Sequence, residues 1–220
     1  MIMSFKENLK KLWNFIWHED SILSWTINII IAFLLIKFVI YPGIGLILGT
    51  NLPVVAVISE SMEHNSPLDQ WWNSPALCGD GNMFYSNYTT CTQADWYKAK
   101  GISYEQFRNF PMSNGFNKGD IIILKGTSYE NLQLGEIIVY QSKLAYPIIH
   151  RVVEKNDVIQ TKGDHNQRQI VDTQLNEKYI SRDELIGKAW IKIPFIGYLK
   201  IWFVDILNCA FSGFHQCIIE

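Results

Sequence analysis

The sequence predicts a mainly β domain that follows an N-terminal transmembrane helix and precedes an apolar, membrane-associated C-terminal segment. Residues Ser21 to Tyr41 are rich in Ile, Leu, Phe and Val, and about 20 such residues suffice to cross the hydrocarbon core of a bilayer. Beyond Gly119, short apolar runs alternate with turn residues, which is typical of a β barrel or sandwich. Residues 194–220 are apolar again, but a full span would place Asp205 in hydrocarbon. We therefore expect this last segment to lie on the membrane surface or to insert only partly.

The segment before the span, residues 1–20, has mixed charges and apolar residues at helical spacing. These apolar residues are Phe5, Leu9, Leu12, Trp13 and Ile16. The helix they predict could lie on a membrane surface or be an ordinary amphipathic helix. Lys6, Lys10 and Lys11 precede the span and no Lys or Arg follows it closely, which favours a cytoplasmic N-terminus and an extracytoplasmic β domain.

A cleaved signal peptide is the competing interpretation of the span. The apolar run is too long for one, and it lacks a small-residue cleavage pattern. Pro42, Gly43 and Gly45 follow it, and because Pro and Gly disfavour helix we expect the helix to end near Tyr41.

The chain has 220 residues, a formal net charge of −2 and no long basic run, so it gives no indication of nucleic-acid binding. Its length allows one domain with additional segments. We place that domain at residues 52–193, with a polar insertion at residues 63–118. The expected strands are Val54–Ile58, Asp120–Leu124, Glu136–Tyr140, Tyr146–Val153, Val158–Thr161 and Leu185–Ile193.

Within the insertion, Cys78 and Cys91 flank a loop that contains the N-glycosylation acceptor pattern Asn87–Thr89. A disulfide here would agree with an oxidising, extracytoplasmic compartment, and two free thiols are the alternative. No Cys-x-x-Cys or His-x-x-x-His pattern accompanies these cysteines, which argues against a zinc site. Ser103 is expected to cap a short helix further along the insertion.

Two serines follow the first apolar strand of the domain directly. Ser59 and Ser61 are two residues apart, and in an extended segment such residues point to the same face. This arrangement suits a nucleophile beside a hydrogen-bond donor for a developing oxyanion. The alternative is a strand that simply ends in polar residues.

The β region supplies the other residue types of a serine hydrolase. His150 lies within the apolar strand at Pro147–Val153, Asp164 lies in a turn, and Asp172 follows the apolar pair Ile170 and Val171. A Ser nucleophile, a His that takes its proton and an Asp that orients the imidazole are the parts of a catalytic triad. A buried structural histidine and a turn-forming Asp164 are the alternatives.

Short motifs along the chain occur in the order of the conserved boxes of type I signal peptidases. They are Ser59–Met62, Gly119–Asp120, Gly135–Tyr140, His150–Val153 and Lys162–Asn166. The chain resembles the archaeal and endoplasmic-reticulum branch, in which His stands where bacterial enzymes have Lys. It departs from the usual pattern at Glu60, where Gly is frequent, and at His64, where Pro is common.

The resemblance implies a membrane-bound serine endopeptidase that cleaves signal peptides from exported preproteins. It assigns Ser61 as nucleophile, His150 as general base and Asp172 as the triad acid after a small insertion, with Ser59 and Asp164 in supporting roles. It implies that no metal or cofactor is needed. The expected partners are the signal peptides of preproteins, membrane lipid and the protein-translocation channel, at a cell membrane or an endoplasmic-reticulum-type membrane.

Two alternatives stay open from the sequence. One is a non-catalytic, membrane-anchored surface protein that binds a partner through a loop closed by Cys78 and Cys91. The other is a Ser–Lys enzyme, which would use Lys143 or Lys162 as its base.

Overall fold

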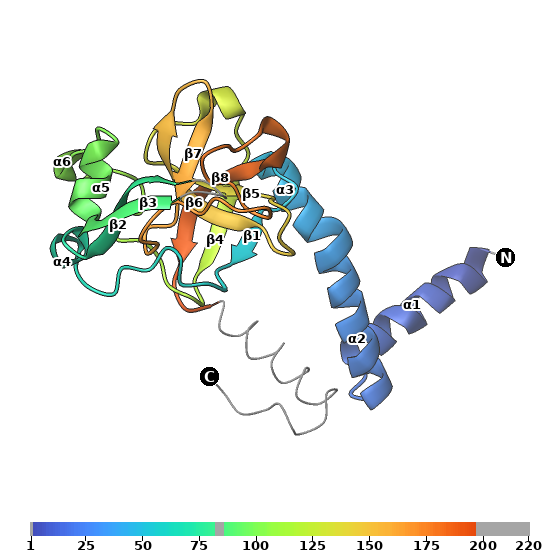
Figure 1. Ribbon diagram of the computed structural model, residues 1–220. Helices are drawn as coiled ribbons and strands as arrows, with labels where there is room; N and C mark the ends of the chain where they lie inside the picture. The colour runs from blue at the N-terminus through green and yellow to red at the C-terminus, as the bar shows by residue number, and fades with distance from the viewer. Residues whose placement is uncertain (1, 82–85, 197–220) are drawn as a thin grey trace. The chain divides into compact units, whose positions relative to one another are not determined.

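The computed structural model describes residues 2–81 and 86–196 (Figure 1). The chain divides into two compact units, residues 1–47 and residues 48–220. The predicted membrane-associated segment 194–220 lies outside the described residues from position 197 onward.

The first unit begins with two helices, α1 (Ile2–His18) and α2 (Ile22–Leu35). Ser21 caps α2, because its hydroxyl accepts a hydrogen bond from the Ser24 amide. The Ser24 hydroxyl and the Asn28 side chain donate to carbonyl groups at the end of α1, at 2.7 and 2.8 Å. These bonds satisfy helix-end carbonyls that would otherwise lack partners.

The apolar helix runs further than the sequence predicts. It continues from α2 through the π-helical turn Ile36–Ile40 into α3 (Tyr41–Leu48). Among the described residues, one helix, 22–48, is therefore long and apolar enough to cross a membrane. The expectation that Pro42 and its neighbouring glycines end the helix is wrong. Proline removes a hydrogen bond and crowds the carbonyl four residues earlier, and the wider π turn just before it accommodates both effects.

The second unit is built on a six-stranded antiparallel sheet with the order β1-β4-β8-β5-β6-β7 (Figure 1). The strands are β1 (Val54–Ala56), β4 (Ile121–Lys125), β5 (Ile137–Tyr140), β6 (Ile148–Lys155), β7 (Ile159–Lys162) and β8 (Leu185–Ile193). All lie where the alternating and β-branched runs predict them, so the mainly β domain is confirmed. β1 forms one edge of the sheet and β7 the other.

Both faces of the central strand β5 are buried. Ile137 and Val139 pack into one core cluster, and Ile138 and Tyr140 pack into another. This division follows from the alternation of side chains along a strand. A strand buried on both faces holds its neighbour β6 in a fixed register, which places Ile138 opposite His150.

The insertion, residues 63–118, is a compact substructure rather than a polar loop. It contains α4 (Leu68–Trp72), the hairpin β2 (Pro75–Gly81) and β3 (Ser86–Thr92), α5 (Gln93–Ala99) and α6 (Tyr104–Arg108). Cys78 and Cys91 form a disulfide across the hairpin. Ser103 caps α6 as expected, and Gln106 completes the capping box.

A cluster of buried aromatic side chains forms the core of the insertion. It comprises Trp71, Trp72, Trp96, Tyr97 and Phe107. Their rings lie in tilted and edge-to-face contact, for example 4.9 Å between the centroids of Tyr97 and Phe107. Val153 of β6 belongs to the same cluster, so the insertion packs directly against the sheet that carries His150 (Figure 1).

Candidate active site

Ser61 lies in a tight turn that leaves the sheet after β1. The Val57 amide still bonds to the Asp120 carbonyl, and the turn closes where the Glu63 amide donates to the Glu60 carbonyl. Met62 is fully buried and anchors the turn in the core. The hydroxyl oxygens of Ser59 and Ser61 are 3.2 Å apart. Their spacing in the sequence predicts this convergence.

His150 lies in the interior of β6, with a side chain only 3% exposed. Its ring nitrogens face different groups. Nδ1 lies 2.5 Å from Oε1 of Glu177, a carboxylate that is completely buried. Nε2 faces Gly163, because a β-carbon built on that glycine would lie only 2.8 Å from it.

The segment Lys162–Asn166 brings Ser61 and His150 to the same place. The same β-carbon at Gly163 would lie 2.7 Å from the Ser61 carbonyl oxygen, and the His165 amide donates to that oxygen at 2.9 Å. Both contacts of the added carbon are closer than van der Waals distance allows. The absence of a side chain at Gly163 therefore lets the serine turn and the imidazole approach each other.

A comparison with protein-family models gives no match for this chain. Among curated proteins it is similar to catalytic subunits of the signal peptidase complex. The relative from Sclerotinia sclerotiorum is 37% identical over 100 residues, which cover 41% of this chain and 57% of the relative. Those from Pyricularia oryzae and Neurospora crassa are 36% and 35% identical over the same shares. The matched region is therefore similar to the endoplasmic-reticulum type of signal peptidase I. The chain spans less than two thirds of the length of these relatives.

Asp172, which the sequence resemblance assigns as the triad acid, lies in an exposed turn. Its Oδ1 accepts hydrogen bonds from the amides of Gln174 and Leu175, at 2.7 and 2.8 Å. The structure shows no contact between Asp172 and His150 among the described residues. It brings Glu177 to the imidazole instead.

Sequence reasoning did not single out Glu177, which belongs to none of the family motifs. A signal was nevertheless present. Leu175 and Glu177 are buried, and the residues between and after them are exposed or half-exposed. An acid that shares the period-two pattern of a buried apolar residue points toward the core.

Asp164 is fully buried and lies against Arg151. The guanidinium Nη2 donates to Oδ2 at 2.7 Å, and the His64 ring and the Tyr97 hydroxyl also contact the carboxylate, at 3.2 and 3.3 Å. Burial opposes ionisation, but the Arg151 charge and these hydrogen bonds outweigh it and hold the pKa of Asp164 well below its usual range. Asp164 therefore joins the insertion to the Gly163 loop.

Neither lysine considered as an alternative base is placed beside His150. Lys143 is exposed in the loop between β5 and β6. Lys162 is opposite Arg151 in the β6–β7 register, so its side chain shares the face of Arg151. Its ammonium group donates to Gln93 and to the Gly163 carbonyl. Burial lowers the pKa of Lys162 to about 8, although nearby carboxylates oppose that shift.

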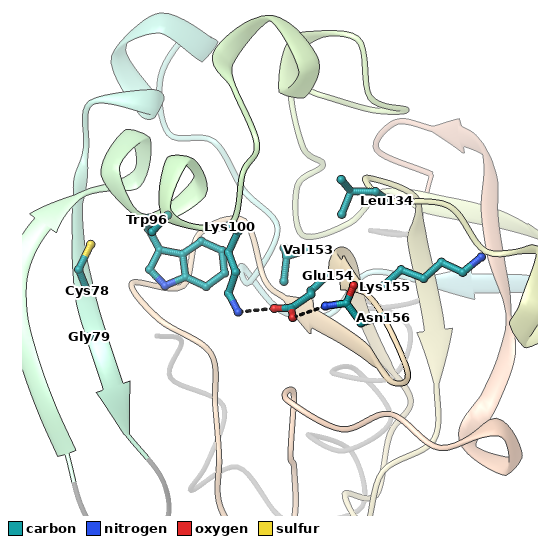
Figure 2. A pocket seen from close by; sticks show the side chains of 10 residues that line it. Cys78, Gly79, Trp96, Lys100, Leu134, Val153, Glu154, Lys155 and Asn156 are labelled. Atoms are coloured by element: carbon teal, nitrogen blue, oxygen red, sulfur yellow. Dashed lines mark hydrogen bonds and ion pairs between the residues drawn. The ribbon is translucent and has the colours of Figure 1, made fainter.

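A pocket of about 560 Å³ is lined by Val153, Glu154 and Lys155 (Figure 2), which form the end of β6 farther from His150 along the strand. Trp96 and Leu134 contribute to its walls, and Lys100 reaches across from α5 to Glu154, with Nζ and Oε2 2.5 Å apart. Asn156 donates to the same carboxylate, as Figure 2 shows. Because Lys100 and Asn156 already bind the Glu154 carboxylate, the residues that line the pocket include no free acid or nucleophile suited to hydrolysis. No cluster of metal-ligating side chains occurs in the described ranges.

Proposed function

We propose that this protein is a membrane-bound serine endopeptidase that cleaves signal peptides from exported preproteins. The observation that carries the proposal is the convergence of Ser61 and His150 on Gly163. A serine hydroxyl and a buried imidazole backed by a carboxylate are the components that acyl-transfer chemistry requires. The similarity to catalytic subunits of the signal peptidase complex supports the choice of substrate.

In the proposed reaction, Ser61 Oγ attacks the carbonyl carbon of the scissile peptide bond. His150 takes the hydroxyl proton at Nε2 and gives it to the leaving amine. Water then hydrolyses the acyl-serine ester, with His150 again as the base. The Ser59 hydroxyl, which lies 3.2 Å from that of Ser61, donates a hydrogen bond to the oxyanion in both steps.

The edge strand β1 offers a binding site for an extended substrate. It pairs with β4 on one side, and among the described strands it has no partner on the other. A peptide that adds to this free edge would run beside the chain that leads to Ser61. The substrate we infer is therefore a signal peptide whose apolar helix lies in the membrane and whose cleavage region is extended.

We further propose that the N-terminus is cytoplasmic and that the β domain is extracytoplasmic, in an endoplasmic-reticulum-type or cell membrane. The disulfide between Cys78 and Cys91 supports an oxidising compartment, and the apolar helix 22–48 supports membrane anchoring. The relatives are subunits of a complex, so membrane lipid, companion subunits and the translocation channel are proposed partners. Protease protection in sealed vesicles tests the orientation, and a β domain digested from the cytoplasmic side would contradict it.

The activity is tested with full-length protein reconstituted in lipid and a preprotein substrate. Ser61→Ala should abolish cleavage. Ser59→Ala should lower the rate by about 10² to 10³, the usual effect of losing one oxyanion donor. Ser128→Ala is the matched control, because Ser128 is exposed and its side chain makes no helix-capping bond. Full cleavage by Ser61→Ala would refute the proposed function.

A further inference from the structure

We propose that Glu177, and not Asp172, is the acid that positions His150 for catalysis. The inference rests on the proposed function and replaces the Ser–His–Asp arrangement of the family with a Ser–His–Glu arrangement in this chain. It makes Glu177 a positioning residue, since it acts on the substrate only through the imidazole.

The first support is the contact itself. Glu177 Oε1 and His150 Nδ1 are 2.5 Å apart, and the two side chains are 0% and 3% exposed. The two atoms are in ion-pair contact without hydrogen-bond alignment, and neither has a hydrogen-bond partner among the described residues. A buried carboxylate loses its hydration, and this loss is strongly unfavourable unless a partner compensates it. The imidazole N–H is the partner available to Oε1.

The second support is the way Glu177 is held. Its other carboxylate oxygen, Oε2, accepts a hydrogen bond from the Ile170 amide at 2.5 Å. Its own amide donates to the Ile170 carbonyl, and its carbonyl accepts from the Thr161 amide of β7. Backbone and side chain are thus both fixed to neighbouring segments. A carboxylate held in this way can fix the orientation of a ring that contacts it.

Asp172 has a different task in the same segment. Its carboxylate bonds to the amides of Gln174 and Leu175 and so closes the turn between Val171 and Asn176, which form a β-bridge. That turn reverses the chain and returns Glu177 to a position beside Ile170. Asp172 shapes the turn, and Glu177 makes the contact with the imidazole.

The contact has a defined chemical consequence. A carboxylate at Nδ1 accepts the proton of that nitrogen and selects the tautomer whose Nε2 lone pair faces Gly163 and the serine turn. It also stabilises the imidazolium that forms when His150 takes the serine proton. In a serine protease triad, replacing the acid by its amide lowers kcat by about 10⁴. Loss of the Glu177 charge should have an effect of this kind.

The test compares Glu177→Gln, Glu177→Asp and the matched control Asp172→Asn in full-length, lipid-reconstituted protein. Glu177→Gln should lower kcat by about 10² to 10⁴ with little change in KM. Asp172→Asn should stay within about threefold of wild type, since the amide oxygen can still accept the turn hydrogen bonds.

Wild-type kcat in Glu177→Gln, or a folded but inactive Asp172→Asn, would overturn the inference. If Glu177→Gln does not fold, Glu177→Asp decides. This variant keeps the charge but shortens its reach, so a lowered kcat at unchanged Tm supports the inference and an unchanged kcat refutes it. Ser61→Ala, assayed in parallel, separates the two proposals. If it still cleaves, the proposed function fails, and if it is inactive while Glu177→Gln is fully active, only the role of Glu177 fails.

Discussion

Replacing Asp164 by Asn should destabilise the β domain strongly, although the change removes only a charge. The Arg151 guanidinium is completely buried and makes hydrogen bonds to both carboxylate oxygens of Asp164. Its remaining hydrogen bonds go to the backbone carbonyls of Pro111, Met112 and Gly135. Asn would leave a buried cation that only neutral groups contact. Breaking a buried ion pair from one side costs about 3–5 kcal/mol.

For a domain of this size, 1 kcal/mol corresponds to about 2–4 °C in Tm, so Asp164→Asn should lower Tm by roughly 6–20 °C. Tryptophan fluorescence is a suitable probe, because Trp71 and Trp96 are buried in the insertion beside this network. Asp172→Asn is the control, since an exposed change of this kind usually costs less than about 0.5 kcal/mol.

The pH dependence provides a second readout of the same pair. The folded-state pKa of Asp164 is lowered, so its stabilisation is complete above the unfolded pKa of about 4 and is lost as the pH falls toward the folded value. The Tm difference between wild type and Asp164→Asn should therefore be largest near pH 7 and should narrow below about pH 4. A variant with wild-type Tm at pH 7 would refute the reasoning.

The remaining predictions concern the Gly163 loop and the insertion. Gly163→Ala should lower kcat by at least about 10², because its β-carbon would displace the Ser61 carbonyl and the imidazole; wild-type cleavage would contradict this contact. The pKa of Lys162 is about 8 in the folded state and 10.5 ordinarily, so the unfolded chain holds this proton to higher pH than the folded protein does. The free energy of unfolding of wild type, measured by chemical denaturation, should therefore rise relative to that of Lys162→Met by up to about 3 kcal/mol between pH 8 and 10.5. A difference in unfolding free energy that does not change with pH would contradict the lowered pKa. Replacing Cys78 and Cys91 together by Ala should cost about 3 kcal/mol of unfolding free energy, as expected for a short closed loop, and an unchanged denaturation midpoint would oppose it.

The regular part of the fold could be predicted from local patterns. Period-two and β-branched runs locate the six sheet strands, because each strand must bury at least one face. Ser61 and His150 could be singled out because motifs surround them. Their proximity depends on Gly163, whose missing side chain acquires meaning only when the loop is placed against both residues.

Other features depend on information that local patterns lack. The insertion has helices of five to seven residues, too short to display a helical period, so its aromatic residues look scattered until they meet in one cluster. The family spacing predicts Asp172 as the acid at His150. The turn that Asp172 closes leaves its own side chain exposed, and the side chain of Glu177 reaches inward instead. Pro42 predicts a helix end in the sequence, yet the π-helical turn before it lets the helix continue.

The segment that contains the serine turn and the insertion leaves the sheet at Val57 and returns at Gly119, where the Gly119 amide donates a hydrogen bond to the Val57 carbonyl. Two residues of the insertion, Tyr97 and His64, contact Asp164. They precede it in the sequence by 67 and 100 residues. Contacts so distant in sequence form late, because the loop-closure entropy must be overcome first. A chain emerging from a ribosome would carry Ser61 long before the loop that holds Gly163 is supported. On the proposed function, the serine turn and the imidazole would then come together only after the Gly163 loop has been synthesised.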